Sequence, residues 1–198
     1  MALKIGITGG IGAGKSIVCR IFKTLGIPVY DADLEAKLLM VKDENVKKAL
    51  IDIFGPETYL NNGDVNRAFL SNQVFKDQKK LDELNAVVHP AVIQHGIDWA
   101  NNQTGPYSLK EAALLFESGS YFNLDKVILV TAPENIRIQR VVQRDGVSKQ
   151  QVQDRISKQM PEEQKLQMAD IVIVNDGIRP LIPQVYDLHH QFLKEVHA

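Results

Sequence analysis

Residues 7–22, ITGGIGAGKSIVCRIF, contain the motif that decides the fold. Residues 9–16 read GGIGAGKS and match the phosphate-binding pattern G-x-x-x-x-G-K-[ST]. The apolar run LKIGIT before the motif predicts a buried strand, and helical spacing follows it at Val18, Ile21, Phe22 and Leu25. A glycine-rich turn without a ligand is the alternative, but a strand before the motif and a helix after it favour phosphate binding.

The chemistry of this motif predicts ATP and Mg²⁺ as ligands. Its glycines allow successive backbone N–H groups to turn towards a phosphate, at the positive end of the following helix. We expect Lys15 to reach the β- and γ-phosphates and the hydroxyl of Ser16 to be the Mg²⁺ ligand. The residues expected to bind the nucleotide here are Gly10, Gly12, Ala13, Gly14, Lys15, Ser16 and Ile17.

The composition is that of an ordinary globular chain. It has 198 residues, 44% hydrophobic and 24% charged, with a net charge of −1, which gives no general basic surface for nucleic acid or an anionic membrane. The single cysteine excludes an intrachain disulfide, and no apolar run approaches the ~18 residues that a membrane span needs. We expect a cytoplasmic monomer that acts on a small molecule, without nucleic acid or membrane partners.

Apolar runs alternate with helical patterns along much of the chain. Besides the strand before the glycines, we expect strands at 27–33, 109–117, 125–133 and 170–176, and a closing helix from Ile178 to about Phe192. Strands that are apolar on both faces predict an α/β fold, a five-stranded parallel sheet with helices on both sides. We expect a single domain whose core comprises about 1–40, 105–136 and 168–198, interrupted by a helical insertion at about 41–104 and an Arg-rich lid at about 137–167.

Two aspartates end the predicted second strand, in the sequence VYDAD. Asp31 and Asp33 would lie at the edge of the sheet where ligands bind in parallel α/β folds. A carboxylate there can accept a proton from an attacking hydroxyl, or hold Mg²⁺ through water. Capping of the following helix is the alternative for either residue.

Other polar residues give weaker signals. Glu117 would end the third strand, where phosphate-loop enzymes order Mg²⁺, although a loop carboxylate is the alternative. Arg137, Arg140 and Arg144 share one helix face without a matching acid, which favours contact with a phosphoryl group over a solvated surface. Pro90 predicts a break or kink at His89, whose residue type alone indicates a structural histidine.

The guanine-binding motif N-K-x-D of switch GTPases is missing, no D-x-x-G follows the predicted third strand, and a mechanical ATPase would be longer. A small-molecule kinase therefore fits the residues best. The segments GITGGIGAGKS, YDAD, HP, LLFE, QRVVQRDG and ADIVIVNDG resemble, in this order, the dephospho-coenzyme A kinase family. The resemblance extends from Ile5 to about Gly177.

This resemblance implies a nucleoside-monophosphate-kinase-like parallel sheet with a lid, in which the helical insertion at about 41–104 binds the acceptor. It also implies transfer of phosphate from ATP to the ribose 3′-hydroxyl of dephospho-coenzyme A, the last step of coenzyme A synthesis. Asp33 would be the general base, with Lys15 as the other catalytic residue. The acceptor would also meet Thr8, Asp31, His89 and Glu117, whereas Arg140, Arg144 and Asn175 would contact ATP.

Two departures from the family pattern are Ile17, where a threonine is usual, and KEAALLFE, where a proline commonly precedes LLFE. Two other functions stay open: another small-molecule or nucleotide kinase, and a non-catalytic ATP-binding regulator.

Overall fold

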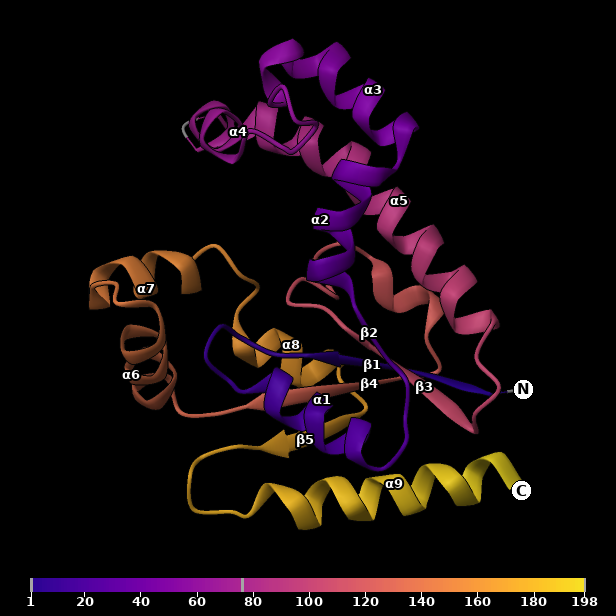
Figure 1. Cartoon of the computed structure of the whole chain (residues 1–198). Coiled ribbons are helices and arrows are strands. Elements are labelled where there is room, and N and C mark those ends of the chain that lie inside the picture. The colour runs from indigo at the N-terminus through magenta and orange to yellow at the C-terminus, as the bar shows by residue number, and fades with distance from the viewer. Residues whose placement is uncertain (1, 76, 198) are drawn as a thin grey trace. The chain divides into compact units, whose positions relative to one another are not determined.

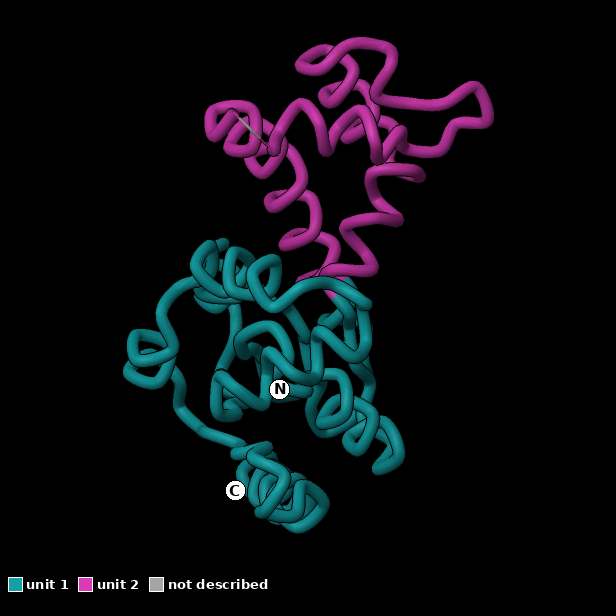
Figure 2. The backbone as a smooth tube through the Cα atoms, turned by 90° about the vertical axis from the view of Figure 1, so that its left-hand side faces the viewer, with its two compact units in different colours: residues 1–31, 99–198 teal, residues 32–98 magenta. Residues whose placement is uncertain are grey.

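The computed structural model describes residues 2–75 and 77–197, and the chain forms two compact units, coloured separately in Figure 2. The first unit comprises residues 1–31 and 99–198, and the second comprises residues 32–98. The predicted insertion at about 41–104 overlaps the second unit. The division of the remainder into a core and a lid stays a prediction.

The first unit contains a five-stranded sheet in the order β2-β3-β1-β4-β5, and every neighbouring pair is parallel. The predicted fold class is therefore confirmed. The strands are β1 (Leu3–Thr8), β2 (Val29–Asp31), β3 (Tyr107–Glu111), β4 (Lys126–Thr131) and β5 (Ile171–Val174). β1, which precedes the glycine motif, lies at the centre of the sheet.

Helices α1 (Lys15–Thr24) and α9 (Leu181–His197) cover one face of the sheet, as Figure 1 shows. Alternate residues of the strands form a continuous core with them: Ile5, Ile7, Leu109, Ile128, Val130 and Ile173 pack with Val18, Cys19, Phe22, Val185 and Phe192. Cys19 lies in this core, as its helical position predicts. Because the sheet is fully buried on this face, the end of β1 and the start of α1 are held in a fixed geometry.

The opposite face is covered by α8 (Glu162–Met168) and by the chain between β3 and β4, which includes a 3₁₀ turn at Ser120–Asn123. Gly6 of β1 faces this side. A Cβ atom there would lie 2.6 Å from a methyl carbon of Leu115 and 2.7 Å from one of Leu124. The absence of a side chain at Gly6 therefore allows this segment to pack directly against β1.

All four strands predicted after the glycine motif are too long at their carboxyl ends. The strands predicted at 125–133 and 170–176 end earlier, at Thr131 in β4 and at Val174 in β5. The other two errors change the positions of candidate site residues. The run at 109–117 leaves the sheet at Glu111, because Leu115 turns back to pack over Gly6 instead of continuing the ladder. The run at 27–33 ends at Asp31, and helix α2 (Ala32–Lys42) begins at the next residue. Consequently Glu117 is not at a strand end, and Asp33 lies in the first turn of a helix.

The second unit is built from helices, with α3 (Glu44–Phe54), a 3₁₀ turn at Pro56–Thr58, α4 (Arg67–Val74) and most of α5 (Gln78–Asn101) following α2. Asp43 caps α3 by accepting hydrogen bonds from the N–H groups of Asn45 and Val46. An isolated bridge between Tyr59 and Val65 closes the turn before α4.

Of the break or kink predicted at His89, the break is wrong, because α5 continues through Pro90 as one helix; the kink stays a prediction. Val88 and Val92 are buried on either side of Pro90 and hold the helix in place. Pro90 and Ala86 are both exposed, so the carbonyl group that proline leaves without a donor can reach water. Packing thus outweighs the local preference of the residue before proline.

Helices α6 (Glu134–Asp145) and α7 (Lys149–Ile156) form the pair that the polar sequence predicts. They share a small core of their own, made by Ile138, Val141 and Val152. Gly146 ends α6, and Ser148 begins α7 with a capping box to Gln151. In the part of the chain that the structure describes, no helix is long and apolar enough to cross a membrane.

Candidate nucleotide-binding site

The glycine motif forms a loop between the end of β1 and the start of α1, as predicted. Two of its glycines are required by close contacts as well as by conformation. Gly12 has φ +79°, and a Cβ atom would lie 2.4 Å from the carbonyl oxygen of Arg137. Gly14 has φ +98°, and a Cβ atom would lie 2.2 Å from Nδ2 of Asn175. A side chain at either position would push the loop away from its supports.

Lys15 is the first residue of α1 and folds back over the loop. Its ammonium group donates a hydrogen bond to the carbonyl oxygen of Gly9 at 3.0 Å. The charge is therefore held above the loop, at the helix N-terminus, where an anion is favoured. This arrangement suits a bound phosphate.

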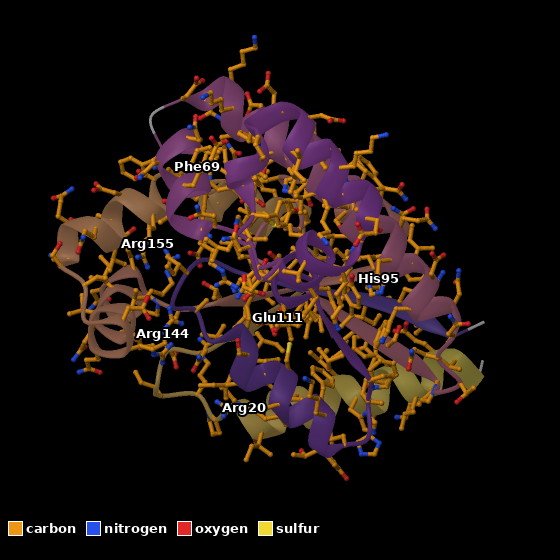
Figure 3. All side chains as sticks on the ribbon, turned by 45° about the horizontal axis from the view of Figure 1, so that its top comes forward. Arg20, Phe69, His95, Glu111, Arg144 and Arg155 are labelled. Carbon is orange, nitrogen blue, oxygen red and sulfur yellow. The ribbon has the colours of Figure 1, made fainter. Side chains whose placement is uncertain are left out.

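Ser16 makes the contact that the sequence did not predict. Its Oγ donates to Oε1 of Glu111 at 3.0 Å, and Figure 3 shows Glu111 close to the start of α1. Glu111 is the last residue of β3, the strand beside β1. The signal for it was present, since Glu111 is the first acid after the apolar strand residues. It was missed because the strand was extended to Glu117.

Several polar side chains meet at the carboxyl edge of the sheet, where ligands bind in parallel α/β folds. Thr8 ends β1, and Asp31 ends β2 in register with Glu111 of β3. Thr8 is fully buried, and its hydroxyl donates to the carbonyl oxygen of Ala113 at 3.4 Å. The structure therefore gathers Thr8 and Asp31 with the loop in the first unit.

Asn175, which follows β5, is a support of the loop. Its Nδ2 donates to the carbonyl oxygen of Ala13 at 2.8 Å, and its own backbone N–H donates to Thr131 at 2.8 Å. Its Oδ1 accepts a hydrogen bond from Arg140 at 3.4 Å. One buried residue thus joins β4, through its backbone, to the phosphate loop and α6, through its side-chain amide.

The three arginines of α6 do not act as one exposed group. Arg137 is buried and forms an ion pair at 2.8 Å with Glu162, an acid that comes from α8 and not from its own helix face. Arg144 is exposed and pairs with the adjacent Asp145 at 2.7 Å, which raises the pKa of its guanidinium (Figure 3). Arg140 is half-buried next to Asn175, with a buried Nη1 that has no hydrogen-bond partner among the described residues.

The segment after α7 also reaches the loop. Oε1 of Gln159 accepts the backbone N–H of Ile11 at 3.0 Å. A Cβ atom on Gly10 would lie 2.0 Å from Nη1 of Arg137, so this arginine packs directly against the loop backbone. Neither contact could be predicted from the sequence, because both depend on how the chain folds over the sheet.

Glu117 forms an ion pair with a buried lysine. Its carboxylate lies 2.9 Å from Nζ of Lys165 on α8 and accepts the N–H of Met160 at 3.0 Å. Burial alone would raise the pKa of Glu117, but the hydrogen bonds from Lys165 and the backbone outweigh it and hold the pKa below its usual value of 4.5. Lys165 is only 1% exposed. This pair joins α8 to the segment that covers β1.

Of the remaining predicted residues, Asp33 and His89 belong to the second unit, whereas Ile17 lies on α1 of the first unit. Asp33 is exposed in the first turn of α2, where the positive end of the helix favours a carboxylate. His89 is half-buried on α5, and burial lowers its pKa. Ile17, predicted to contact the nucleotide, is 44% exposed on α1, and its N–H donates to Gly14.

Replacing Glu117 with Gln should lower the free energy of unfolding by about 3 kcal/mol at pH 7, because Lys165 would stay buried without its partner. Urea unfolding of the wild type and the variant measures the difference. Since the pKa of Glu117 is lowered in the folded state, its contribution is complete above about pH 4.5 and is lost as the pH falls through the folded value. The difference should therefore shrink in acid.

The matched control is Glu163→Gln, which removes an exposed carboxylate from the same helix as Lys165. It should change stability by less than about 0.5 kcal/mol. Equal unfolding midpoints for Glu117→Gln and Glu163→Gln would contradict the structural role given to the ion pair.

Together these contacts describe a loop that can cradle phosphates, with a lysine above it and a hydroxyl paired to a carboxylate beside it. The model of a protein family described as "Dephospho-CoA kinase" matches residues 3–180 of this chain. A dephospho-CoA kinase of Bacteroides fragilis is 37% identical over 198 residues, which cover 100% of this chain and 96% of that protein.

Two solved structures are also similar. TT1252 from Thermus thermophilus has a TM-score of 0.82 at 35% identity, covering 98% of this chain and 97% of that one. The dephospho-CoA kinase from Campylobacter jejuni has a TM-score of 0.72 at 25% identity, and the match covers 98% of this chain and 99% of that one. The match of residues 3–180, with a loop geometry suited to phosphates, shows that this chain belongs to the dephospho-CoA kinase family.

Proposed function

We propose that this protein transfers the γ-phosphate of ATP to the ribose 3′-hydroxyl of dephospho-coenzyme A, giving coenzyme A and ADP. This is the last step of coenzyme A synthesis. The observation that carries the proposal is the phosphate loop, with its Ser16–Glu111 pair, in a chain that matches this family over residues 3–180.

The loop and Lys15 act on the donor. Phosphoryl transfer passes through a loose transition state, so positioning and neutralisation of charge supply most of the catalysis. The backbone N–H groups of the loop hold the phosphates, and Lys15 leaves the carbonyl of Gly9 to meet them. Because the loop is held by Asn175 and packed against Arg137, it needs little rearrangement on binding.

Ser16 and Glu111 have the chemistry of a Mg²⁺ site. Mg²⁺ prefers oxygen ligands, keeps several waters and binds through one or two side chains together with substrate phosphates. A hydroxyl and a carboxylate 3.0 Å apart beside the loop fit this preference. The described residues contain no cluster of three or more acidic, histidine or cysteine ligands, so no all-protein metal cage competes with this assignment. When bound, the ion would neutralise charge on the phosphates.

Asp33 acts on the acceptor as the general base. It is exposed in the first turn of α2, so the carboxylate is accessible to a ligand. It would orient the 3′-hydroxyl and accept its proton as the new P–O bond forms. Asp31 and Thr8 at the sheet edge, His89 on α5 and Glu117 are proposed as further acceptor contacts; for Glu117 the contact would be indirect, through its pair with Lys165.

Arg140, Arg144 and Asn175 are proposed to contact ATP, from a lid formed by α6 and α7. The buried Nη1 of Arg140, without a described partner, supports this role most directly. Closure of such a lid would exclude water that could otherwise take the phosphate. We propose that the enzyme works as a cytoplasmic monomer, with a small molecule as its acceptor and without nucleic acid.

The wild-type protein, given ATP, Mg²⁺ and dephospho-coenzyme A, should form coenzyme A, with the new phosphate on the 3′ carbon of the ribose. Release of ADP in a coupled assay gives the rate, and phosphorus NMR of the purified product gives the position. Faster turnover of a sugar or a nucleoside than of dephospho-coenzyme A would favour another small-molecule kinase. Tight ATP binding without turnover would favour a regulator.

Asp33→Asn should reduce turnover about 10²–10⁴-fold, the usual contribution of one acid–base group, because an amide cannot accept the proton. ATP binding, measured by calorimetry, should stay close to that of the wild type. Asp52→Asn, which replaces an exposed aspartate on α3, is the control and should keep full activity. Full activity in Asp33→Asn would reject this residue as the base.

Glu111→Gln should raise the Mg²⁺ concentration needed for half-maximal turnover about 10–100-fold, the range found when groups that support a metal ligand are lost. Calorimetry should show a similar loss of Mg²⁺-dependent ATP binding, with metal-free binding unchanged. Glu111→Asp keeps the charge on a shorter side chain, so its Mg²⁺ requirement should lie between those of the wild type and Glu111→Gln. An unchanged Mg²⁺ requirement in Glu111→Gln would exclude this carboxylate from the metal site.

A further inference from the structure

The phosphate loop is in contact with the first turn of α6 through Arg137, a residue without an assigned part in the reaction. Nη1 of Arg137 lies 2.0 Å from the place that a Cβ atom on Gly10 would take. The carbonyl oxygen of the same arginine lies 2.4 Å from the corresponding place at Gly12. Arg137 therefore meets the loop at two glycines, once with its side chain and once with its backbone.

Two further side chains complete this contact. Oε2 of Glu162, at the start of α8, pairs with Nη2 of Arg137 at 2.8 Å, and its Oε1 accepts a hydrogen bond from the hydroxyl of Thr131 in β4. Oε1 of Gln159 accepts the backbone N–H of Ile11 at 3.0 Å. These residues all belong to the first unit. We refer to Arg137, Gln159 and Glu162 as the loop clasp, because they join the loop to β4 and to the segment between α7 and α8.

Stability alone does not account for an arginine at this place. Arg137 is 5% exposed, and its Nε has no hydrogen-bond partner among the described residues. A buried donor without a partner lowers stability, and a buried ion pair can often be replaced by apolar side chains at no loss. A guanidinium supplies what an apolar side chain lacks, namely a rigid, planar and permanently charged group beside a loop suited to phosphates.

The position of Arg137 differs from that of the other two arginines of α6. Arg144 is exposed, and Arg140 is half-buried with a buried Nη1 that has no described partner. The guanidinium of Arg137 instead lies between the loop backbone and the carboxylate of Glu162. It is therefore placed to act on a bound nucleotide through the loop.

We propose that Arg137 is a positioning residue for the phosphates of ATP, held by Glu162 and assisted by Gln159. The loop clasp fixes residues 10–12, so that the N–H groups of the loop face the phosphates before ATP binds. The inference rests on the proposed function, because it describes how that site receives its donor. It concerns nucleotide binding alone, so it can be tested without the acceptor.

The first test removes the guanidinium. Arg137→Met should raise the Kd for ATP, measured by calorimetry, about tenfold or more. Turnover should fall by up to about 10²-fold, since small misplacements of reacting groups have effects of this size. The KM for dephospho-coenzyme A should stay unchanged. An unchanged Kd for ATP in the folded variant would overturn the proposal.

The matched control is Arg155→Met, which removes an exposed arginine that pairs with Asp145 at 3.2 Å (Figure 3). It takes away the same charge from α7, away from the loop clasp, and should bind ATP as the wild type does. An equal loss of ATP binding in Arg155→Met and Arg137→Met would reduce the effect to net charge and would contradict the proposal.

The second test separates positioning from stability. Arg137→Met/Glu162→Met replaces the ion pair with two apolar side chains, so no partner is left with an unpaired charge. Its midpoint of thermal unfolding should be higher than that of Arg137→Met and close to that of the wild type. Its Kd for ATP should stay about tenfold raised. Recovery of ATP binding together with stability would show a merely structural role and overturn the proposal.

The third test leaves the ion pair intact. Gln159→Met removes the acceptor for the N–H of Ile11 and should raise the Kd for ATP about threefold to tenfold, the net worth of one hydrogen bond. Gln167→Met, which changes an exposed glutamine of α8, is the control and should have no effect. Wild-type ATP binding in both Gln159→Met and Arg137→Met/Glu162→Met would overturn the proposal, even if Arg137→Met did not fold.

These measurements fail separately from the proposed function. Absence of coenzyme A formation by the wild type would reject the proposed reaction, whereas calorimetry with ATP alone would still decide the role of the loop clasp. Conversely, coenzyme A formation with an unchanged Kd for ATP in all folded clasp variants would keep the reaction and overturn this inference.

Discussion

The hydrogen bond from Asn175 to the carbonyl oxygen of Ala13 is the contact on which the nucleotide site depends. It joins residues 162 positions apart in the sequence and fixes the loop against the end of the sheet. The same amide requires glycine at position 14 and accepts a hydrogen bond from Arg140. The shape of the loop, the identity of one glycine and the position of the Arg140 guanidinium therefore depend on one buried side chain.

Much of the fold could be predicted from the sequence, because burial on both faces of a parallel sheet leaves apolar runs that are easy to recognise. β1, β4, β5 and α1 follow from such runs and from the glycine motif. The carboxyl ends of β2 and β3 could not be located in this way. Ala and Leu after Glu111 suit a strand and a covering turn equally well, and only the space above Gly6 decides between them. The continuous helix at Pro90 was missed for a similar reason, since Val88 and Val92 act through packing.

The candidate site follows the same division. Lys15, Ser16 and the glycines were predictable, because a local motif brings them together. Glu111, Gln159 and the partners of Arg137 were not, since each is defined by a contact with a distant segment. Asn175 was expected only as a nucleotide contact, through a family resemblance, and its support of the loop became visible in the structure. For Glu117 the sequence predicted a role at a strand end, but in the structure its carboxylate forms an ion pair with the buried Lys165.

The position of Cys19 has a consequence for an enzyme whose acceptor and product both carry a thiol. Cys19 is the only cysteine of the chain, it is 2% exposed in the core beneath the sheet, and burial, followed by the charge of Glu111, raises the pKa of its thiol. Exchange with a disulfide requires an accessible thiolate. Oxidised forms of the acceptor or product therefore cannot attach to the folded protein as mixed disulfides, and the protein should stay free of this modification in an oxidised coenzyme A pool.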